Sequence, residues 1–144
     1  MSEKWDRRFL DLSSHVAQWS KDASTQVGAV ITDSRKRIVS VGFNGYPAGV
    51  DDSKVPSRDE KLRRTIHAER NAILFAGRDL SGCTIYVTHH PCAGCMATII
   101  QAGIVRVVFP APQGDFADRW KDDIRSAQEM AIEAEVILSS IETL

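Results

Sequence analysis

The chain has 144 residues, of which 43% are hydrophobic and 26% are charged, and its formal net charge is −1. These values are typical of a globular protein, so we expect one domain over residues 1–144. The near-neutral charge disfavours a nucleic-acid partner, and no apolar run is long enough to span a membrane. The polar N-terminus is unlike a signal peptide, and the three cysteines favour metal chemistry over disulfides, so we expect a cytoplasmic protein.

The first half of the chain predicts a helix followed by a β-hairpin. From about Lys4 to Trp19, apolar residues recur every three or four positions, as on one face of a helix. Two segments rich in β-branched residues, 26–31 and 37–43, follow on either side of a turn-prone stretch and predict the hairpin. Residues 44–64 start with glycines and prolines and continue with many charges, which predicts a long loop.

Helices and strands alternate in the second half. We expect helices over 67–77, 92–102 and 120–134, the last one marked by Trp120, and strands over 84–88, 105–109 and 135–138. Strands joined through a helix pair in parallel by right-handed crossovers. The sequence therefore predicts an α/β fold with three α-β-α layers, in which a five-stranded mixed sheet has its last strands parallel.

Two short motifs carry the candidate chemistry: residues 67–69, His-Ala-Glu, and residues 91–95, Pro-Cys-Ala-Gly-Cys. One imidazole and two thiolates suit tetrahedral Zn²⁺ and leave its fourth position open, as in catalytic zinc sites. We expect one Zn²⁺ per chain, bound by His67, Cys92 and Cys95. Both motifs are predicted to begin a helix, where free backbone N–H groups favour a thiolate over a thiol.

The spacing H-x-E followed by P-C-x-x-C is the signature of zinc-dependent nucleobase deaminases. Glu69 is then expected to be the catalytic acid and base, because hydrolytic deamination moves several protons. The alternative for Glu69 is a surface role at a helix start, where acids are favoured. A closed structural site would need a fourth ligand from His89, His90 or Cys83; we expect the histidines to shape the pocket mouth and Cys83 to pack in the core.

The sequence resembles the deoxycytidylate (dCMP) deaminase family, within the cytidine deaminase superfamily. The segments that match lie in family order over most of the first 109 residues: 20–30, 42–47, 67–73 and 86–103. The resemblance implies a cytidine-deaminase-like fold and zinc-dependent hydrolysis of dCMP to dUMP and ammonia, which would supply dUMP for thymidylate synthesis. It also implies assembly through helices near the active site, often as dimers or hexamers.

The resemblance further implies which residues contact a small nucleotide substrate. Asn44 would contact the sugar, the loop of Ser24 and Thr25 would lie near the phosphate, and the backbone at Ala68 would meet the pyrimidine edge. Gly45 would let the backbone come close to the ligand. From the residues alone, Asn44 and Gly45 could equally form a turn that ends a strand, and Ser24 and Thr25 a helix-to-strand turn.

Lys21 is the cation expected beside Ser24 and Thr25 at the phosphate, with Arg70 as a second candidate. Some phage members of the family use Cys and His before the HAE motif to bind a second zinc, but residues 44–64 contain neither. Residues 110–116 stand where the family would have a tyrosine-containing segment, which leaves the sugar-side pocket and regulation by deoxynucleoside triphosphates open.

Two other functions are compatible with the motifs. One is deamination of another cytosine nucleotide or nucleoside, such as dCTP or 5-modified dCMP. The other is a zinc-stabilised binding module without catalysis, against which the intact Glu69 argues. We also expect a homo-oligomer, from dimer to hexamer, because the first helix carries Trp5 and Trp19 as well as Phe9.

Overall fold

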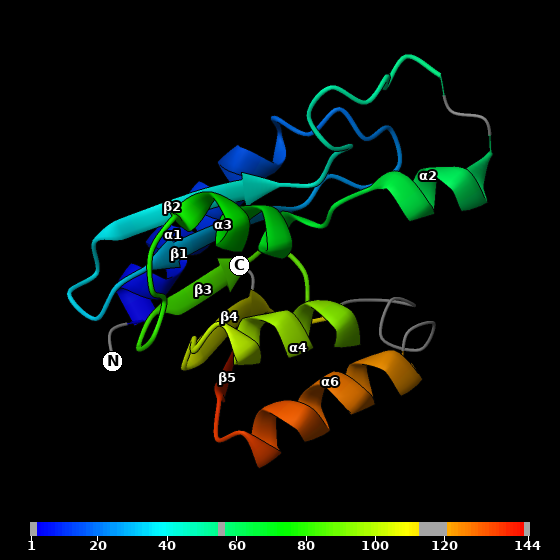
Figure 1. Cartoon of the computed structure of the whole chain (residues 1–144). Coiled ribbons are helices and arrows are strands. Elements are labelled where there is room, and N and C mark those ends of the chain that lie inside the picture. The colour runs from blue at the N-terminus through cyan, green and yellow to red at the C-terminus, as the bar shows by residue number, and fades with distance from the viewer. Residues whose placement is uncertain (1–2, 55–56, 113–120, 143–144) are drawn as a thin grey trace.

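A five-stranded mixed sheet in the order β2-β1-β3-β4-β5 organises the chain (Figure 1). The structure is a computed structural model that describes residues 3–54, 57–112 and 121–142. β1 pairs antiparallel with β2 and β3, whereas β4 pairs parallel with β3 and β5. The predicted mixed sheet with parallel last strands is confirmed. The strands are β1 (Gly28–Thr32), β2 (Ile38–Phe43), β3 (Thr84–Val87), β4 (Arg106–Pro110) and β5 (Ile137–Ile141).

Helices cover both faces of the sheet and give the predicted three α-β-α layers. α1 packs on one face, while α3, α4 and α6 lie on the other (Figure 1). Among the described residues no helix is long and apolar enough to cross a membrane. Trp120 and residues 113–116 lie outside the described residues. The helices are α1 (Glu3–Ala17), α2 (Arg58–Arg64), α3 (Ala68–Ala76), α4 (Ala93–Gln101) and α6 (Lys121–Glu133).

Successive residues of the central strands enter two separate hydrophobic cores, because side chains alternate between the faces of a sheet. In β3, Ile85 and Val87 join the larger core beneath α3, α4 and α6. Tyr86, between them, joins the smaller core beneath α1, where its ring lies 5.0 Å from that of Phe9. Burial on both faces keeps the ends of these strands, and the loops that follow them, in fixed positions.

The prediction of a loop over residues 44–64 is wrong at its end, because residues 58–64 form α2. Ser57 is the N-cap of this helix, and its Oγ accepts a hydrogen bond from the backbone N of Glu60 at 3.1 Å. The pattern Ser-x-x-Glu is that of a capping box, so the signal was present in the sequence. None of the residues of α2 is buried, which explains why its apolar pattern is weak.

The last strand runs from Ile137 to Ile141, later than the predicted 135–138. Glu135 adopts a left-handed backbone with φ of 61°, and Val136 N donates to the carbonyl of Ala131 at 2.8 Å. These contacts close the end of α6, so the chain becomes extended only after them.

Gly42 lets α3 lie directly against β2. A Cβ atom at this position would be 2.4 Å from the backbone N of Ala72 and 2.5 Å from the carbonyl oxygen of Ala68. The Ser40 hydroxyl also donates to the carbonyl of Ala72 at 2.7 Å, which joins the same two elements. Because α3 begins next to His67, this close packing fixes the position of the first metal-binding motif.

We expect Gly42→Ala to lower the free energy of unfolding by about 3 kcal/mol or more, because the backbone of α3 must move away. Gly45→Ala is the matched control, since a Cβ there would meet nothing within 4 Å. Urea unfolding of both variants measures the difference. Equal unfolding midpoints for the two variants would show that the contact between β2 and α3 tolerates a methyl group.

Candidate active site

His67, Cys92 and Cys95 converge at the adjoining N-termini of two helices. His67 is the N-cap of α3 and Cys92 is the N-cap of α4, as the sequence predicts. His67 Nδ1 lies 3.5 Å from Cys92 Sγ and 3.3 Å from Cys95 Sγ, and one ligand atom from each residue lies within 4.8 Å of the others. These separations allow one metal ion to reach all three side chains.

The protonation of the two thiols shows that the group suits a divalent cation. The hydrogen bond from Cys95 lowers the pKa of the Cys92 thiol to about 3, and the same contact raises the pKa of Cys95. Two adjacent thiolates repel each other, so without a cation only one of them ionises readily. A Zn²⁺ ion would offset this repulsion and bind both sulfurs. The donor set of two sulfurs and one nitrogen therefore fits zinc.

Glu69 lies in the first turn of α3 and is only 4% exposed. Burial raises the pKa of its carboxyl group, against the opposing effects of the nearby His67 and Cys95. An acid with a raised pKa beside metal ligands is equipped to hold and release a proton. Ala68 precedes it as the first residue of α3 and is fully buried; an N–H at this helix position has no partner within the helix.

The neighbouring histidines and the third cysteine are not in the metal-binding group found among the described residues. The His90 ring is buried and lies 4.6 Å from the ring of Phe109, and its Nδ1 is 2.8 Å from the carbonyl of Pro91. His89 Nδ1 is 3.1 Å from Thr88 Oγ1. Cys83 is 1% exposed and lies in the larger core, as the sequence predicts.

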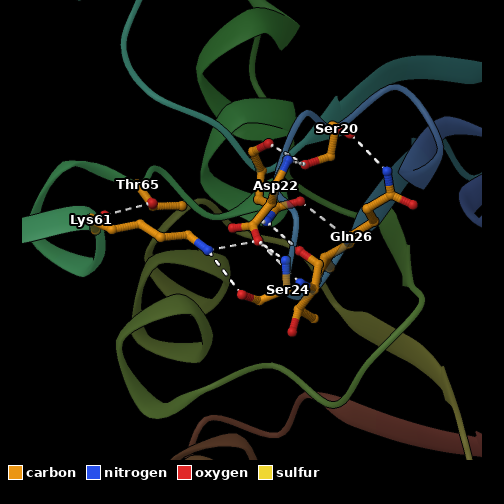
Figure 2. A network of polar contacts seen from close by, with 9 residues as sticks. Ser20, Asp22, Ser24, Gln26, Lys61 and Thr65 are labelled. Carbon is orange, nitrogen blue, oxygen red and sulfur yellow. Dashed lines mark hydrogen bonds and ion pairs between the residues drawn. The ribbon is translucent and has the colours of Figure 1, made fainter. Parts of the chain in front are cut away.

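Asp22 organises the loop in which the phosphate is predicted to bind (Figure 2). Its Oδ1 accepts hydrogen bonds from the backbone N of Ser24 at 2.8 Å and of Thr25 at 3.0 Å. Lys61 Nζ, from α2, lies 2.9 Å from the same oxygen and 3.2 Å from Ser24 Oγ. Burial raises the pKa of Asp22, but the hydrogen bonds from Lys61, Thr25 and Ser24 outweigh it and lower the pKa overall.

The predicted phosphate cation, Lys21, points elsewhere. Its Nζ forms an ion pair with Asp52 at 3.1 Å, and its side chain is 83% exposed. Lys61, which is not among the residues predicted from the sequence, is instead the cation in contact with Ser24 (Figure 2). The capping box that starts at Ser57 predicts the helix that carries Lys61, but not which side chain of that helix reaches Ser24.

Asn44 and Gly45 connect this loop to the metal-binding motif. Asn44 is 6% exposed; its Oδ1 accepts from Val27 N at 2.9 Å, and its Nδ2 donates to the Thr25 carbonyl at 2.9 Å. Gly45 and Ile66 exchange backbone hydrogen bonds of 3.1 and 2.8 Å directly before His67. The residues predicted to contact the sugar and the phosphate therefore form one network beside the metal ligands; their contacts with substrate stay a prediction.

Arg70 lies on the exposed side of α3, next to the first turn of α4. A Cβ atom at Gly94 would come within 2.7 Å of its guanidinium, so the glycine of the CAGC sequence leaves room for this side chain. Arg70 also lines an open groove of about 650 Å³, which the metal-binding residues do not line. The lining residues are Pro47, Val50, Arg63, Arg64, Thr65, Ile66, Arg70 and Leu74.

Comparison with known proteins places these features in a family. Residues 3–111 match the family model of the cytidine and deoxycytidylate deaminase zinc-binding region. The chain is 55% identical over 137 residues to the uncharacterized deaminase in the luxG 3' region of Aliivibrio fischeri, covering 94% of this chain and 92% of that protein. It is 41% identical over 114 residues to the deoxycytidylate deaminase of Pongo abelii, covering 74% of this chain and 64% of that longer protein.

A solved structure shares the fold. The dCMP deaminase of the cyanophage S-TIM5, crystallised with dCMP and dUMP, superposes with a TM-score of 0.79 at 23% identity, covering 98% of this chain and 99% of that one. This likeness confirms the cytidine-deaminase-like architecture. Since the family match covers more than half of the chain and includes its metal-binding group, the chain belongs to the cytidine and deoxycytidylate deaminase family of zinc-dependent hydrolases.

Proposed function

We propose that this protein hydrolyses dCMP to dUMP and ammonia in the cytoplasm and thereby supplies dUMP for thymidylate synthesis. The observation that carries the proposal is the buried Glu69 beside three converging soft ligands. The relative from Pongo abelii that is 41% identical supports dCMP as the substrate. The matched region covers 64% of that relative, so this likeness supports dCMP as the substrate without establishing it.

The residues of the site divide the work of deamination between them. His67, Cys92 and Cys95 would hold Zn²⁺, which when bound supplies a Lewis acid that lowers the pKa of water. Glu69 would take up the proton released by the attacking water and pass it to the pyrimidine ring nitrogen. It would then take the second proton from the new hydroxyl on the ring carbon and give it to the departing amine, so that the carbonyl forms as ammonia leaves. Its raised pKa favours this shuttle, because burial lets the carboxyl group hold a proton to higher pH than an exposed glutamate does.

The nucleotide would be oriented by the network at the end of the sheet. We assign the phosphate to the Ser24 and Thr25 hydroxyls together with Lys61, in place of Lys21. The backbone N–H groups of both residues already donate to Asp22, so the hydroxyls and the ammonium are the donors left to the substrate. The Lys61 ammonium donates to Asp22 and to Ser24, and an ammonium can donate three hydrogen bonds.

An ammonia-release assay on a panel of substrates tests the proposal directly. We expect dCMP to be preferred over CMP, deoxycytidine, dCTP and 5-substituted dCMP. A preference for dCTP or for a 5-substituted nucleotide would move the activity to that substrate within the same family. Ammonia release from none of them, with zinc bound, would favour the non-catalytic binding module.

We expect Glu69→Gln to lower kcat by about three orders of magnitude while zinc content is kept, because the amide cannot carry the protons of several steps. Cys92→Ala should instead lose zinc, since one of the three protein ligands is removed. Metal analysis and ammonia release on both variants measure the two effects. Normal turnover by Glu69→Gln would contradict the proton-shuttle role.

Lys61→Met should lower kcat/KM for dCMP about 10- to 100-fold, the usual effect of losing a hydrogen bond to a charged group. Turnover of deoxycytidine, which has no phosphate, should change little. Lys21→Met is the matched control and should leave both substrates unaffected. An equal loss for dCMP and deoxycytidine would show that Lys61 supports only the loop and does not recognise the phosphate.

We also propose that the chain forms a homo-oligomer. Exposed apolar side chains remain on the outer surface of α3, where Leu74 is 67% and Phe75 is 77% exposed. Trp19 is 51% exposed, whereas Phe9 of α1 is buried in the smaller core and is not available for assembly. Light scattering at micromolar concentration should give a mass of at least two chains, and Leu74→Glu with Phe75→Glu should reduce it. A monomer before any substitution would refute the proposal.

A further inference from the structure

A carboxylate of α6 binds the N-terminus of the helix that carries both cysteines. Asp123 Oδ2 accepts a hydrogen bond from the backbone N of Ala93 at 2.9 Å. Ala93 is the first residue of α4 and directly follows Cys92. Its N–H has no partner within the helix, so Asp123 supplies the acceptor that the local chain does not.

α6 contacts the same segment on the other side of Cys92. His90 is 7% exposed, and its Nε2 lies 3.5 Å from Nε2 of Gln128, one to two turns further along α6. The opposite ring nitrogen of His90 is held at 2.8 Å from the Pro91 carbonyl. α4 and α6 also pack side by side along their length (Figure 1). The segment that leads into the two cysteines is therefore held by α6 at two points.

We propose that Asp123 is a positioning residue of the zinc centre. By fixing Ala93, it sets the direction of the first turn of α4, and this turn determines how far Cys92 Sγ and Cys95 Sγ lie from His67. The family match ends at residue 111, so this support comes from a part of the chain beyond the matched region. This role concerns metal binding and does not depend on which substrate the enzyme uses.

Hydrogen-bonding partners of metal-binding segments commonly affect affinity without touching the metal, and their loss costs about 10- to 100-fold. Asp123→Ala should weaken zinc binding by this factor. A neutral acceptor bonds about half as strongly as a carboxylate. Asp123→Asn should therefore weaken zinc binding less, by about threefold to tenfold. We therefore expect zinc affinity to be highest in the unmodified protein, lower in Asp123→Asn and lowest in Asp123→Ala.

Asp122 provides the control, because it lies in the same first turn of α6 but is 83% exposed and pairs with Arg125 at 3.7 Å. Asp122→Ala and Asp122→Asn remove the same charge from the helix start and should leave zinc binding unchanged. Competition with a chromophoric chelator measures the affinity of each protein. The thiolate-to-cobalt absorption of the Co²⁺-loaded protein reports the geometry of the two sulfurs, and it should shift only in the Asp123 variants.

Thermal unfolding of the zinc-free proteins separates positioning from general stability. A contact that only stabilises the fold would lower the apo melting temperature and leave zinc affinity and the cobalt spectrum unchanged, which would overturn the proposal. An equal loss of affinity in the Asp122 variants would overturn it as well. If Asp123→Ala does not fold, Asp123→Asn and Asp122→Asn decide: unchanged zinc affinity in Asp123→Asn refutes the role.

Discussion

The structure depends on bringing the first turns of α3 and α4 into contact, because the three metal ligands come from these two turns. His67 ends an extended segment that pairs with Gly45, while Cys92 follows the loop after β3. Gly42 makes the approach possible because it allows α3 to lie against β2, and Gly94 leaves room for the Arg70 side chain. A side chain at Gly42 would push α3, and His67 with it, away from β2, whereas a Cβ atom at Gly94 would meet only the end of the flexible Arg70 side chain.

Placing the ligands at helix N-termini also shapes the electrostatics of the site. The hydrogen bond from Cys95 lowers the pKa of Cys92, and the helix N-terminus also favours a negative charge there. The same hydrogen bond raises the pKa of Cys95, so a second thiolate needs a cation beside it. Burial keeps Glu69 protonated to higher pH than an exposed glutamate. The same protein environment therefore suits a divalent cation at its two sulfurs and a protonatable acid at Glu69.

The fold and the metal ligands could be predicted because their signals are local. The segments rich in β-branched residues and the His-x-Glu and Cys-x-x-Cys spacings are each short. They predict the strands and the three metal-binding residues that the structure brings together. α2 was missed because its side chains bury nothing, so only the cap at Ser57 marks it.

The contacts of Lys61 with Ser24 and of Asp123 with Ala93 could not be predicted, because they join residues 37 and 30 positions apart. The local sequence does not show that Lys61 rather than Lys21 contacts Ser24, or that Asp123 rather than Asp122 contacts Ala93. Only the packing of the helices decides which of the two side chains reaches its partner. Long-range polar contacts of this kind depend on tertiary structure, whereas helix and strand patterns do not.

The central claim is that this chain holds one zinc ion through two sulfurs and one nitrogen, with one position left to the reaction. Zinc-edge X-ray absorption of the purified, metal-loaded protein tests it most directly. We expect one zinc per chain with two sulfurs at about 2.3 Å and the remaining ligands nitrogen or oxygen at about 2.0–2.1 Å. A third sulfur, a second zinc ion, or no retained zinc would contradict the account.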